Sequence, residues 1–369
     1  MKIAFDHQTF TYQSYGGISR YYIILADELL KLEQDVSVFA GVHQNNYLQD
    51  LPGSVVCGLK LNRYPPKTGR VFQWLNHAMS QAQIKYWQPD IIHETYYSSW
   101  PRLHSDAIRV TSVYDMIHEL YKEQFSSRDK TTLWKKETFN RVNHIISISH
   151  STKKDLVELF GIDESKISVV HLGVDVSAFE RSISSPNTNT RTFILYVGAR
   201  GGYKNFSAFI RAVGSSPSLI NEFDVVAFGG GKFNADEMQL IKQLGFEDSQ
   251  VKQVGGGDEI LAGLYHQAAA FVYPSLYEGF GLPPLEAMAA GCPVVSSNTS
   301  SMPEVVRKAG VYFNPNDIED IRNAIEKVVY STDFRSQLIE AGFENVKGFS
   351  WKKCAQETLS VYQTLTGKV

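Results

Sequence analysis

Cysteine is scarce in this chain of 369 residues, which has only Cys57, Cys292 and Cys354, an odd number at wide spacings. A disulfide scaffold needs more frequent, paired cysteines, so that class is excluded, and the three thiols suggest a reducing compartment. The sequence also lacks a run of ~18 apolar residues, the length needed to span a bilayer. Its start, with Asp6 among the first residues, lacks the apolar core of a signal peptide. We expect a cytoplasmic protein, soluble or peripheral on the inner face of the membrane.

Common metal-binding and nucleic-acid-binding patterns are missing as well. No Asp-x-Asp, His-Glu-x-x-His or closely paired cysteines occur, so the sequence offers no recognisable ligand set for a catalytic metal. The formal net charge is -3, which argues against general binding to nucleic acid. We therefore expect neither a metal centre nor a nucleic-acid partner.

Short apolar strands alternate with amphipathic helical stretches along the whole chain. This alternation predicts an α/β protein with parallel sheets and crossover helices, and the length suits two domains of roughly 170 to 180 residues. The polar, patternless stretch 181–191 is the predicted linker. We expect doubly wound, Rossmann-like domains at 1–180 and 192–348. They should face a central cleft, because ligands of open parallel sheets bind at the carboxyl ends of the strands.

The predicted strands of the first domain are 2–5, 36–40, 91–93, 108–113 and 144–148. Those of the second domain are 193–198, 224–228, 251–254, 270–273 and 293–296.

Residues 274–293, PSLYEGFGLPPLEAMAAGCP, place Glu278 and Glu286 eight positions apart. Pro283 suits the first turn of a helix and Gly291 a left-handed helix end, so the segment predicts a strand, a Gly-rich loop, a short helix and a stop. Glu278 then lies on the loop and Glu286 on the helix. Backbone amides between them would lie at the positive end of the helix dipole. Such a pocket suits a sugar joined to a diphosphate.

This segment closely resembles the Glu-x7-Glu signature of the retaining glycosyltransferases of family 4, the "glycosyl transferases group 1" set with the GT-B fold. The match includes the intervening Gly-Phe-Gly-Leu-Pro and the following Ala-Met-Ala-Ala-Gly-Cys-Pro-Val-Val. The resemblance covers nearly the whole chain and is tightest at 196–205 and 273–297. It implies transfer of a sugar from a nucleotide diphosphate with retention of anomeric configuration. It also implies that the Trp-containing helix in 349–369 returns to the first domain.

The resemblance assigns roles to the motif residues. It implies that Glu286 binds the ribose hydroxyls and Glu278 the transferred sugar. The amides of Phe280, Gly281 and Leu282 are implied to bind the sugar and the phosphate.

The stretch Tyr-Val-Gly-Ala-Arg200-Gly-Gly-Tyr-Lys204-Asn follows the first strand of the second domain. In the family an Arg and a Lys after this strand contact the diphosphate, and Arg200 and Lys204 match in residue type and context. Their separation of four is shorter than in many members, which leaves open which cation touches which phosphate. Fixed cations and amides would then stabilise the leaving group in place of a metal. The alternative is a glycine turn with two surface cations.

Three glycine-rich loops are further candidates. Gly16 and Gly17, between the first strand and its helix, resemble the family loop that approaches the donor phosphate and the acceptor, since glycine lets the backbone come close to a ligand. The loops 229–231 and 255–257 lack the Gly-x-Gly-x-x-Gly pattern of a dinucleotide site. We expect both to face the nucleotide, with Val254, at the end of its strand, contacting the donor. No cofactor besides the donor substrate is expected.

Asp115 and His118 follow a predicted strand, in a segment that resembles one reading His-Asp in many family members. Tyr114 occupies the place of that histidine, so the family's active-site histidine does not carry over. Asp115 could orient an acceptor hydroxyl or the donor sugar, and His118 could hydrogen-bond either. The alternative for His118 is a purely structural histidine.

From residue 51 to residue 89 the chain has five basic residues and no acidic one, with aromatic residues interleaved. Such a surface suits an anionic membrane or a phosphorylated lipid acceptor. A solvated loop with a few packed rings is an equal alternative.

The sequence therefore predicts a retaining, metal-independent hexosyltransferase that uses GDP-mannose or a UDP-hexose, with a slight preference for GDP-mannose. Its acceptor would be a saccharide or a lipid-linked glycan in polysaccharide or lipopolysaccharide assembly. A GT-B nucleotide-sugar epimerase and a non-catalytic nucleotide-sugar-binding protein are the alternatives.

Overall fold

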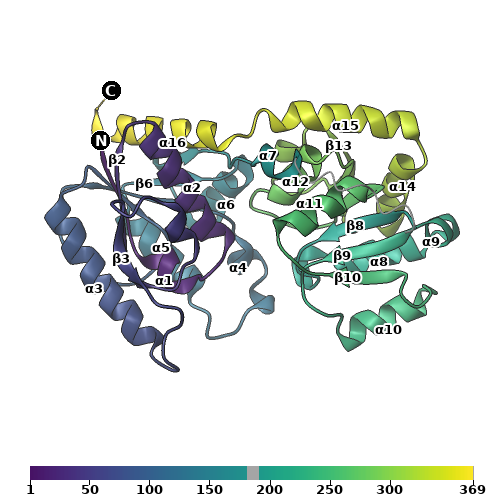
Figure 1. Cartoon of the computed structure of the whole chain (residues 1–369), viewed down its shortest axis with the longest axis horizontal. Coiled ribbons are helices and arrows are strands. Elements are labelled where there is room, and N and C mark those ends of the chain that lie inside the picture. The colour runs from purple at the N-terminus through teal and green to yellow at the C-terminus, as the bar shows by residue number, and fades with distance from the viewer. Residues whose placement is uncertain (181–190, 369) are drawn as a thin grey trace. The chain divides into compact units, whose positions relative to one another are not determined.

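The computed structural model describes residues 1–180 and 191–368 and divides them into two compact units (Figure 1). Unit 1 consists of Met1–His171 together with the segment that starts at Trp351, and unit 2 is Leu172–Ser350. Each unit has one parallel sheet with helices, as the alternation of strands and helices predicts. The predicted α/β class with two doubly wound domains is confirmed.

The sheet of unit 1 has seven parallel strands in the order β3-β2-β1-β4-β5-β6-β7. The strands are β1 (Lys2–Phe5), β2 (Asp35–His43), β3 (Val56–Lys60), β4 (Ile91–Glu94), β5 (Ile108–Val113), β6 (His144–Ser147) and β7 (Ile167–Val169). The helices are α1 (Gln8–Tyr12), α2 (Gly17–Lys31), α3 (Gly69–Trp87), α4 (Ile117–Leu120), α5 (Thr131–Arg141), α6 (His150–Phe160) and α16 (Trp351–Thr366), with short 3-10 turns η1 (Tyr47–Asp50), η2 (Lys122–Gln124) and η3 (Glu164–Lys166). The strand order reverses between β1 and β4, which is where open α/β sheets bind ligands.

The sheet of unit 2 has six parallel strands in the order β10-β9-β8-β11-β12-β13. The strands are β8 (Phe193–Val197), β9 (Asp224–Phe228), β10 (Val251–Val254), β11 (Ala270–Tyr273), β12 (Val294–Ser297) and β13 (Gly310–Phe313). The helices are α7 (Val176–Glu180), α8 (Phe206–Gly214), α9 (Pro217–Glu222), α10 (Ala235–Gln243), α11 (Asp258–Gln267), α12 (Leu282–Ala289), α13 (Met302–Val306), α14 (Ile318–Val329) and α15 (Thr332–Val346), with the 3-10 turn η4 (Gly202–Lys204). Here the order reverses between β8 and β11.

Buried apolar side chains explain why these strands form. Ile194, Tyr196, Val225 and Val272 are fully buried and pack with side chains of the covering helices, such as Phe209 of α8. Strands covered on both faces are apolar at nearly every position, which made β8, β9 and β11 easy to predict. The three strands that the sequence analysis missed, β3, β7 and β13, stand at sheet edges and are only partly buried.

The domain boundary that we expected at residue 180 lies at residue 171 instead. Residues 172–180 belong to unit 2 because α7 packs on α11: the Phe179 carbonyl lies 2.6 Å from Nε2 of His266, and the Phe179 ring lies 6.1 Å from that of Tyr265. The predicted linker 181–191 falls almost entirely on residues 181–190, which lie outside the described residues.

The last helix, α16, belongs to unit 1 and packs against α2. It begins at Trp351, whose ring lies 6.2 Å from that of Tyr21. Tyr362 lies on the same helix, and its hydroxyl oxygen is 2.5 Å from Nδ1 of the buried His93 at β4. Phe349, which we had placed with this segment, stays with unit 2, where its carbonyl accepts a hydrogen bond from the amide of Val174.

Among the described residues, no helix combines the length and the apolar character that crossing a bilayer requires.

Candidate active site

The sheet of unit 2 brings two predicted motifs together at its switch point, the place between β8 and β11 where the strand order reverses. Lys204 follows β8 and Glu278 follows β11, and these two strands are neighbours. The Lys204 ammonium nitrogen lies 2.7 Å from Oε1 of Glu278. Both side chains are largely buried, with 18% of the lysine and 10% of the glutamate exposed. A cation and a carboxylate are therefore fixed at the place where an open parallel sheet binds its ligand.

Backbone and side-chain contacts hold this pair in place. The Leu276 amide donates to the carbonyl of Tyr203 across 2.7 Å, which ties the two loops together. Asn205, in the left-handed conformation with φ 58°, donates from its amide group to the carbonyls of Pro274 and Pro315. Because each loop is fixed to the other, Lys204 and Glu278 are pre-positioned.

Two serines after β12 fix the backbone around Glu278. The Glu278 amide donates to Oγ of Ser300 across 2.8 Å, and Oγ of Ser301 donates to the carbonyls of Glu278 and Phe280. Ser301 is fully buried. The sequence analysis missed both serines, since nothing in their spacing relative to Glu278 signals the contact.

Gly281 ends the loop at the start of α12 in a conformation that favours glycine, with φ 114°. A Cβ atom there would lie 2.5 Å from Cε of Met302. Pro283 lies in the first turn of α12, and Gly291, with φ 71°, lies just past its end, as predicted. The Gly-rich loop therefore connects Glu278 to the N-terminal end of α12, which is the positive end of the helix dipole.

Glu286 lies on α12, eight residues after Glu278. Its Oε2 atom accepts a hydrogen bond from the hydroxyl of Tyr265 across 3.4 Å. Burial and the charge of Glu286 raise the pKa of Tyr265 well above its usual value, so this hydroxyl remains a donor. Burial and the neighbouring Glu278 act in the same way on the pKa of Tyr273. Each motif glutamate thus has a tyrosine beside it.

Arg200 has other partners than we expected. Its guanidinium binds both carboxylate oxygens of Glu237, with Nε to Oε1 at 2.9 Å and Nη2 to Oε2 at 3.2 Å. It also donates to the carbonyls of Gly229 and Lys232, and it lies 4.6 Å from the ring centre of Phe233. Only 3% of the side chain is exposed. The structure brings Lys204, but not the guanidinium of Arg200, to Glu278, and the phosphate contact of Arg200 stays a prediction.

The triple-glycine loop 229–231 follows β9, and all three glycines have positive φ. The Gly229 amide donates to the carbonyl of Val254, the last residue of β10. A Cβ at Gly230 would lie 2.7 Å from Nη1 of Arg200. The packed guanidinium therefore sets the path of this loop, and Val254 lies beside it.

The remaining donor candidates, Gly16 and Gly17, lie in unit 1 at the start of α2. Oγ of Ser19 donates to the carbonyl of Gly16, and the Ser19 amide donates to Oε1 of Gln13. A Cβ at Gly16 would lie 2.4 Å from that same oxygen. The end of the Gln13 side chain thus lies against Gly16, a contact that the sequence pattern alone did not reveal.

Asp115 and His118 lie close together after β5, also in unit 1. Lys135 of α5 donates to the Asp115 carbonyl across 2.8 Å, and its ammonium lies 3.8 Å from the Asp115 carboxylate. His118 stacks on Phe125 at 4.0 Å between ring centres, and its Nε2 atom lies 4.0 Å from Asp129. The buried Lys135 was missed by the sequence analysis, because a lone lysine on a helix carries no signal.

Tyr114, in the position where the family often has histidine, turns toward other tyrosines. Its ring lies 5.8 Å from that of Tyr21, and its hydroxyl oxygen is buried. Burial raises the pKa of Tyr114 well above its usual value. The Tyr114 hydroxyl is therefore a poor candidate for proton transfer.

The family models agree with this geometry. Residues 15–178 match the model described as "Glycosyltransferase Family 4", and residues 179–345 match the model described as "Glycosyl transferases group 1". The chain belongs to glycosyltransferase family 4. The two models divide this family 4 chain close to the boundary between units 1 and 2.

Named relatives and a solved structure extend the likeness. The chain is 29% identical over 238 residues to an O-antigen chain mannosyltransferase B of Escherichia coli, covering 62% of each protein. It is 26% identical to the O-antigen chain mannosyltransferase RfbU of Salmonella typhimurium, covering 85% of this chain and 88% of that one. The crystal structure of Anabaena HepE in complex with UDP and glucose superposes with a TM-score of 0.73 over 99% of this chain and 100% of that one, at 18% identity. The predicted GT-B fold is confirmed.

Proposed function

We propose that this family 4 glycosyltransferase moves a hexose, with mannose preferred, from a nucleotide diphosphate to a saccharide or lipid-linked acceptor, with retention and without a metal. The observation that carries the proposal is the Lys204–Glu278 pair at the switch point beside the start of α12. The leaving diphosphate gains negative charge, so a fixed cation and helix amides stabilise the transition state more than the ground state.

Each side chain then has a task. Lys204 releases Glu278 and turns to the diphosphate, and Glu278 becomes free to accept hydrogen bonds from hydroxyls of the transferred sugar. Glu286 binds the ribose hydroxyls, while the amides of residues 280–282 bind the sugar and phosphate. A retaining transferase of this kind needs no dedicated base if the departing phosphate takes the acceptor proton. The ion pair in the free protein therefore keeps both groups in position until the donor arrives.

Arg200 has a different task in this proposal. Since its guanidinium already holds Glu237 and two carbonyls, it supports the glycine loop 229–231 against which the nucleotide lies. A direct contact with the diphosphate would require those bonds to exchange.

The choice of mannose rests on relatives. The O-antigen mannosyltransferases of Escherichia coli and Salmonella typhimurium are named for this sugar, which favours GDP-mannose as donor and lipopolysaccharide O-antigen or a similar glycan as product. HepE, which shares the fold, was solved with UDP and glucose, so a UDP-hexose is the second candidate.

A thermal-shift screen of the purified protein against GDP, UDP and ADP tests the donor site. Lys204→Ala and Glu286→Ala should lose the shift produced by the preferred nucleotide. Glu340→Ala, which removes an exposed carboxylate of α15, is the matched control and should keep it. If no nucleotide shifts the wild-type melting temperature, or if the shift survives in both site variants, the donor site is wrongly assigned.

Turnover separates the proposal from its alternatives. With GDP-mannose and an acceptor extract, a transferase forms a glycoside whose anomeric configuration, read by NMR, matches that of the donor. The activity should persist in EDTA if no metal is needed. An epimerase would convert the donor without acceptor, and a binding protein would leave it unchanged; either result would replace the proposal.

We also place the enzyme in the cytoplasm, against the inner face of the membrane where a lipid-linked acceptor would lie. The support is the acid-free stretch 51–89, which includes Lys67 and Arg70 and in which Val71 and Trp74 of α3 and Leu59 of β3 are exposed apolar side chains. Cations attract anionic headgroups while rings settle at the interface.

A further inference from the structure

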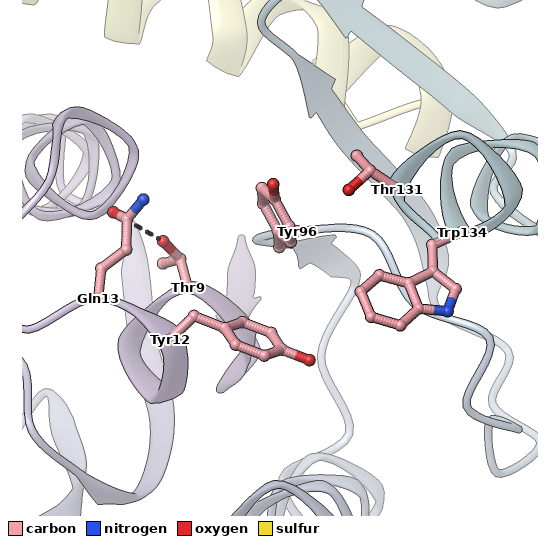
Figure 2. Close-up of a pocket in the computed structure, with 6 residues that line it drawn as sticks. All are labelled: Thr9, Tyr12, Gln13, Tyr96, Thr131 and Trp134. Carbon is pink, nitrogen blue, oxygen red and sulfur yellow. Dashed lines mark hydrogen bonds between the residues drawn. The ribbon is translucent and has the colours of Figure 1, made fainter. Parts of the chain in front are cut away.

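A pocket of about 210 Å³ lies wholly within unit 1 (Figure 2). Its lining residues come from α1 and the residue that follows it, from the segment after β4 and from the first turn of α5, and they are Thr9, Tyr12, Gln13, Tyr96, Thr131 and Trp134. Figure 2 shows the rings of Tyr12 and Trp134 on opposite sides, with Tyr96 between the two groups of side chains. The pocket has no assigned ligand.

The topology of unit 1 makes this a place for a ligand. Tyr12 follows the carboxyl end of β1, and Tyr96 follows that of β4. The strand order of the sheet reverses between these two neighbouring strands. Open parallel sheets bind their ligands in the crevice at such a switch point. The pocket therefore lies where this fold is expected to bind a ligand.

The lining chemistry selects an uncharged, hydroxylated ring. Three aromatic side chains offer apolar faces, and the remaining lining residues offer an amide and two hydroxyls. None of the six is charged, which disfavours a phosphate or a carboxylate as the direct ligand. The volume is below the roughly 300–1,000 Å³ of pockets for drug-sized ligands. A single sugar ring, with apolar C–H faces and polar edges, fits this combination.

Gln13 is fixed in place for this task. Its Oε1 atom accepts the Ser19 amide at 3.0 Å and lies 3.5 Å from Oγ1 of Thr9. Its backbone carbonyl accepts a hydrogen bond from the side chain of Asn45. Within the described residues, Nε2 of Gln13 has no hydrogen-bond partner, so a positioned donor remains for a ligand hydroxyl.

The helix α5 joins the pocket to Asp115. Trp134 lines the pocket, and the next residue, Lys135, binds the Asp115 carbonyl at 2.8 Å. The negative charge of Asp115 also reaches Tyr96: burial and then this charge raise the pKa of Tyr96 to about 12. A sugar in the pocket would therefore lie near the carboxylate that we expect to orient an acceptor hydroxyl.

We propose that this pocket binds one neutral pyranose ring of the acceptor, stacked between Tyr12 and Trp134 and held by Gln13 and Thr131; the assignment to the acceptor rests on the proposed glycosyl transfer. In this proposal unit 1 recognises a terminal sugar of the acceptor rather than a lipid phosphate.

Saturation-transfer NMR with methyl α-D-mannopyranoside and methyl α-D-glucopyranoside tests the pocket directly. Trp134→Ala and Gln13→Ala should weaken binding of the preferred glycoside by roughly tenfold or more. Trp74→Ala, which removes an exposed tryptophan of α3 in the same unit, is the matched control and should bind as the wild type does. Trp134→Phe keeps a ring and should bind better than Trp134→Ala, a difference that does not depend on the alanine variant being fully stable.

Nucleotide thermal shifts, measured on the same samples, separate this proposal from the proposed function. The pocket variants should keep the nucleotide shift of the wild type. Equal glycoside binding by the Trp134 and Trp74 variants, or a wild type that binds nucleotide but neither glycoside, would overturn the pocket. Glycoside binding that is lost in Trp134→Ala, in a protein that binds no nucleotide, would support the sugar pocket while the proposed transferase function fails.

Discussion

Lys204 and Arg200 lie four residues apart but bind different carboxylates: Lys204 pairs with Glu278 at 2.7 Å, and Arg200 pairs with Glu237 at 2.9 Å. The turn η4 between them sends the two cations in different directions. The first cation faces the site at the switch point, and the second supports the loop beside it. Substitutions at these two positions should therefore have different consequences.

Loss of Lys204 should reduce catalysis in addition to stability, because its ion pair with Glu278 is also largely buried. Lys204→Ala removes the fixed cation that would meet the leaving diphosphate, and kcat should fall roughly 10²–10³-fold, as for other groups that stabilise a developing charge. The measurement is steady-state transfer from GDP-mannose. Lys242→Ala, which changes an exposed lysine of α10, is the control. Full activity in Lys204→Ala would rule out this cation as the diphosphate partner.

Loss of Arg200 should first reduce stability. Arg200→Ala leaves Glu237 without its partner and breaks the bonds to the Gly229 and Lys232 carbonyls, and breaking a buried ion pair costs about 3 kcal/mol of the free energy of unfolding. Chemical denaturation measures this cost. Glu237→Ala removes the other partner of the same ion pair. It should weaken nucleotide binding as much as Arg200→Ala does. If Glu237→Ala leaves both properties intact while Arg200→Ala abolishes turnover, Arg200 acts on the diphosphate directly, as the sequence analysis expected.

Gly281→Ala should distort the loop that carries Glu278. The new Cβ would meet Met302 at 2.5 Å, and alanine would have to adopt φ 114°, a strain of about 2 kcal/mol. Nucleotide affinity should fall together with thermal stability. Gly201→Ala is the matched control, since its φ is -88° and no atom lies within 4 Å of the added Cβ. Equal effects of the two substitutions would contradict this explanation.

Unit 1 should lose stability in mild acid through His93. Burial lowers the pKa of His93 from 6.5 to about 3, so the unfolded chain binds a proton in this interval and the folded chain does not. The resulting contribution is fully present above pH 6.5 and is lost as the pH falls toward 3, by about 1.4 kcal/mol per pH unit for this one residue.

Urea denaturation at pH 7 and pH 5 measures that slope. His93→Gln, which cannot titrate, should be less stable at pH 7 because it disturbs the contacts with Ser112 and Tyr362. Its stability should nevertheless fall less steeply between the two pH values. An unchanged slope would show that His93 does not contribute to acid sensitivity.

The basic residues around the start of α3, Lys67 just before the helix and Arg70 in its first turn, should bind anionic membranes. Flotation with vesicles that contain phosphatidylglycerol should recover the wild-type protein at low salt. Lys67→Ala with Arg70→Ala should weaken this binding by roughly tenfold or more, given about 1 kcal/mol for each basic residue near the surface. Lys352→Ala with Lys353→Ala removes equal charge from α16 and should have little effect. Equal losses in both double variants would point to net charge alone rather than to these two residues.

The sequence predicted the fold and the local structure of the segment that carries the two motif glutamates. The buried strands, the helix start at Pro283 and the positive φ of Gly291 follow from local rules, so β8, β11 and α12 were placed correctly. The partners of a charged side chain do not follow from such rules. Arg200 meets Glu237, 37 positions away, because β8 and β9 are neighbours and α10 begins with a capping box that includes Glu237. In the same way, the sugar-sized pocket depends on three segments that only the folded sheet of unit 1 brings together.

Unit 1 is built from two segments of the chain, and the whole of unit 2 lies between them in the sequence. Unit 2 is one continuous segment, so its residues are all available as soon as Ser350 has been synthesised. Unit 1 needs α16, which supplies Tyr362 to the buried His93. Since domains fold as units during synthesis, from the N-terminal side onward, the middle of this protein can complete its core before the beginning does.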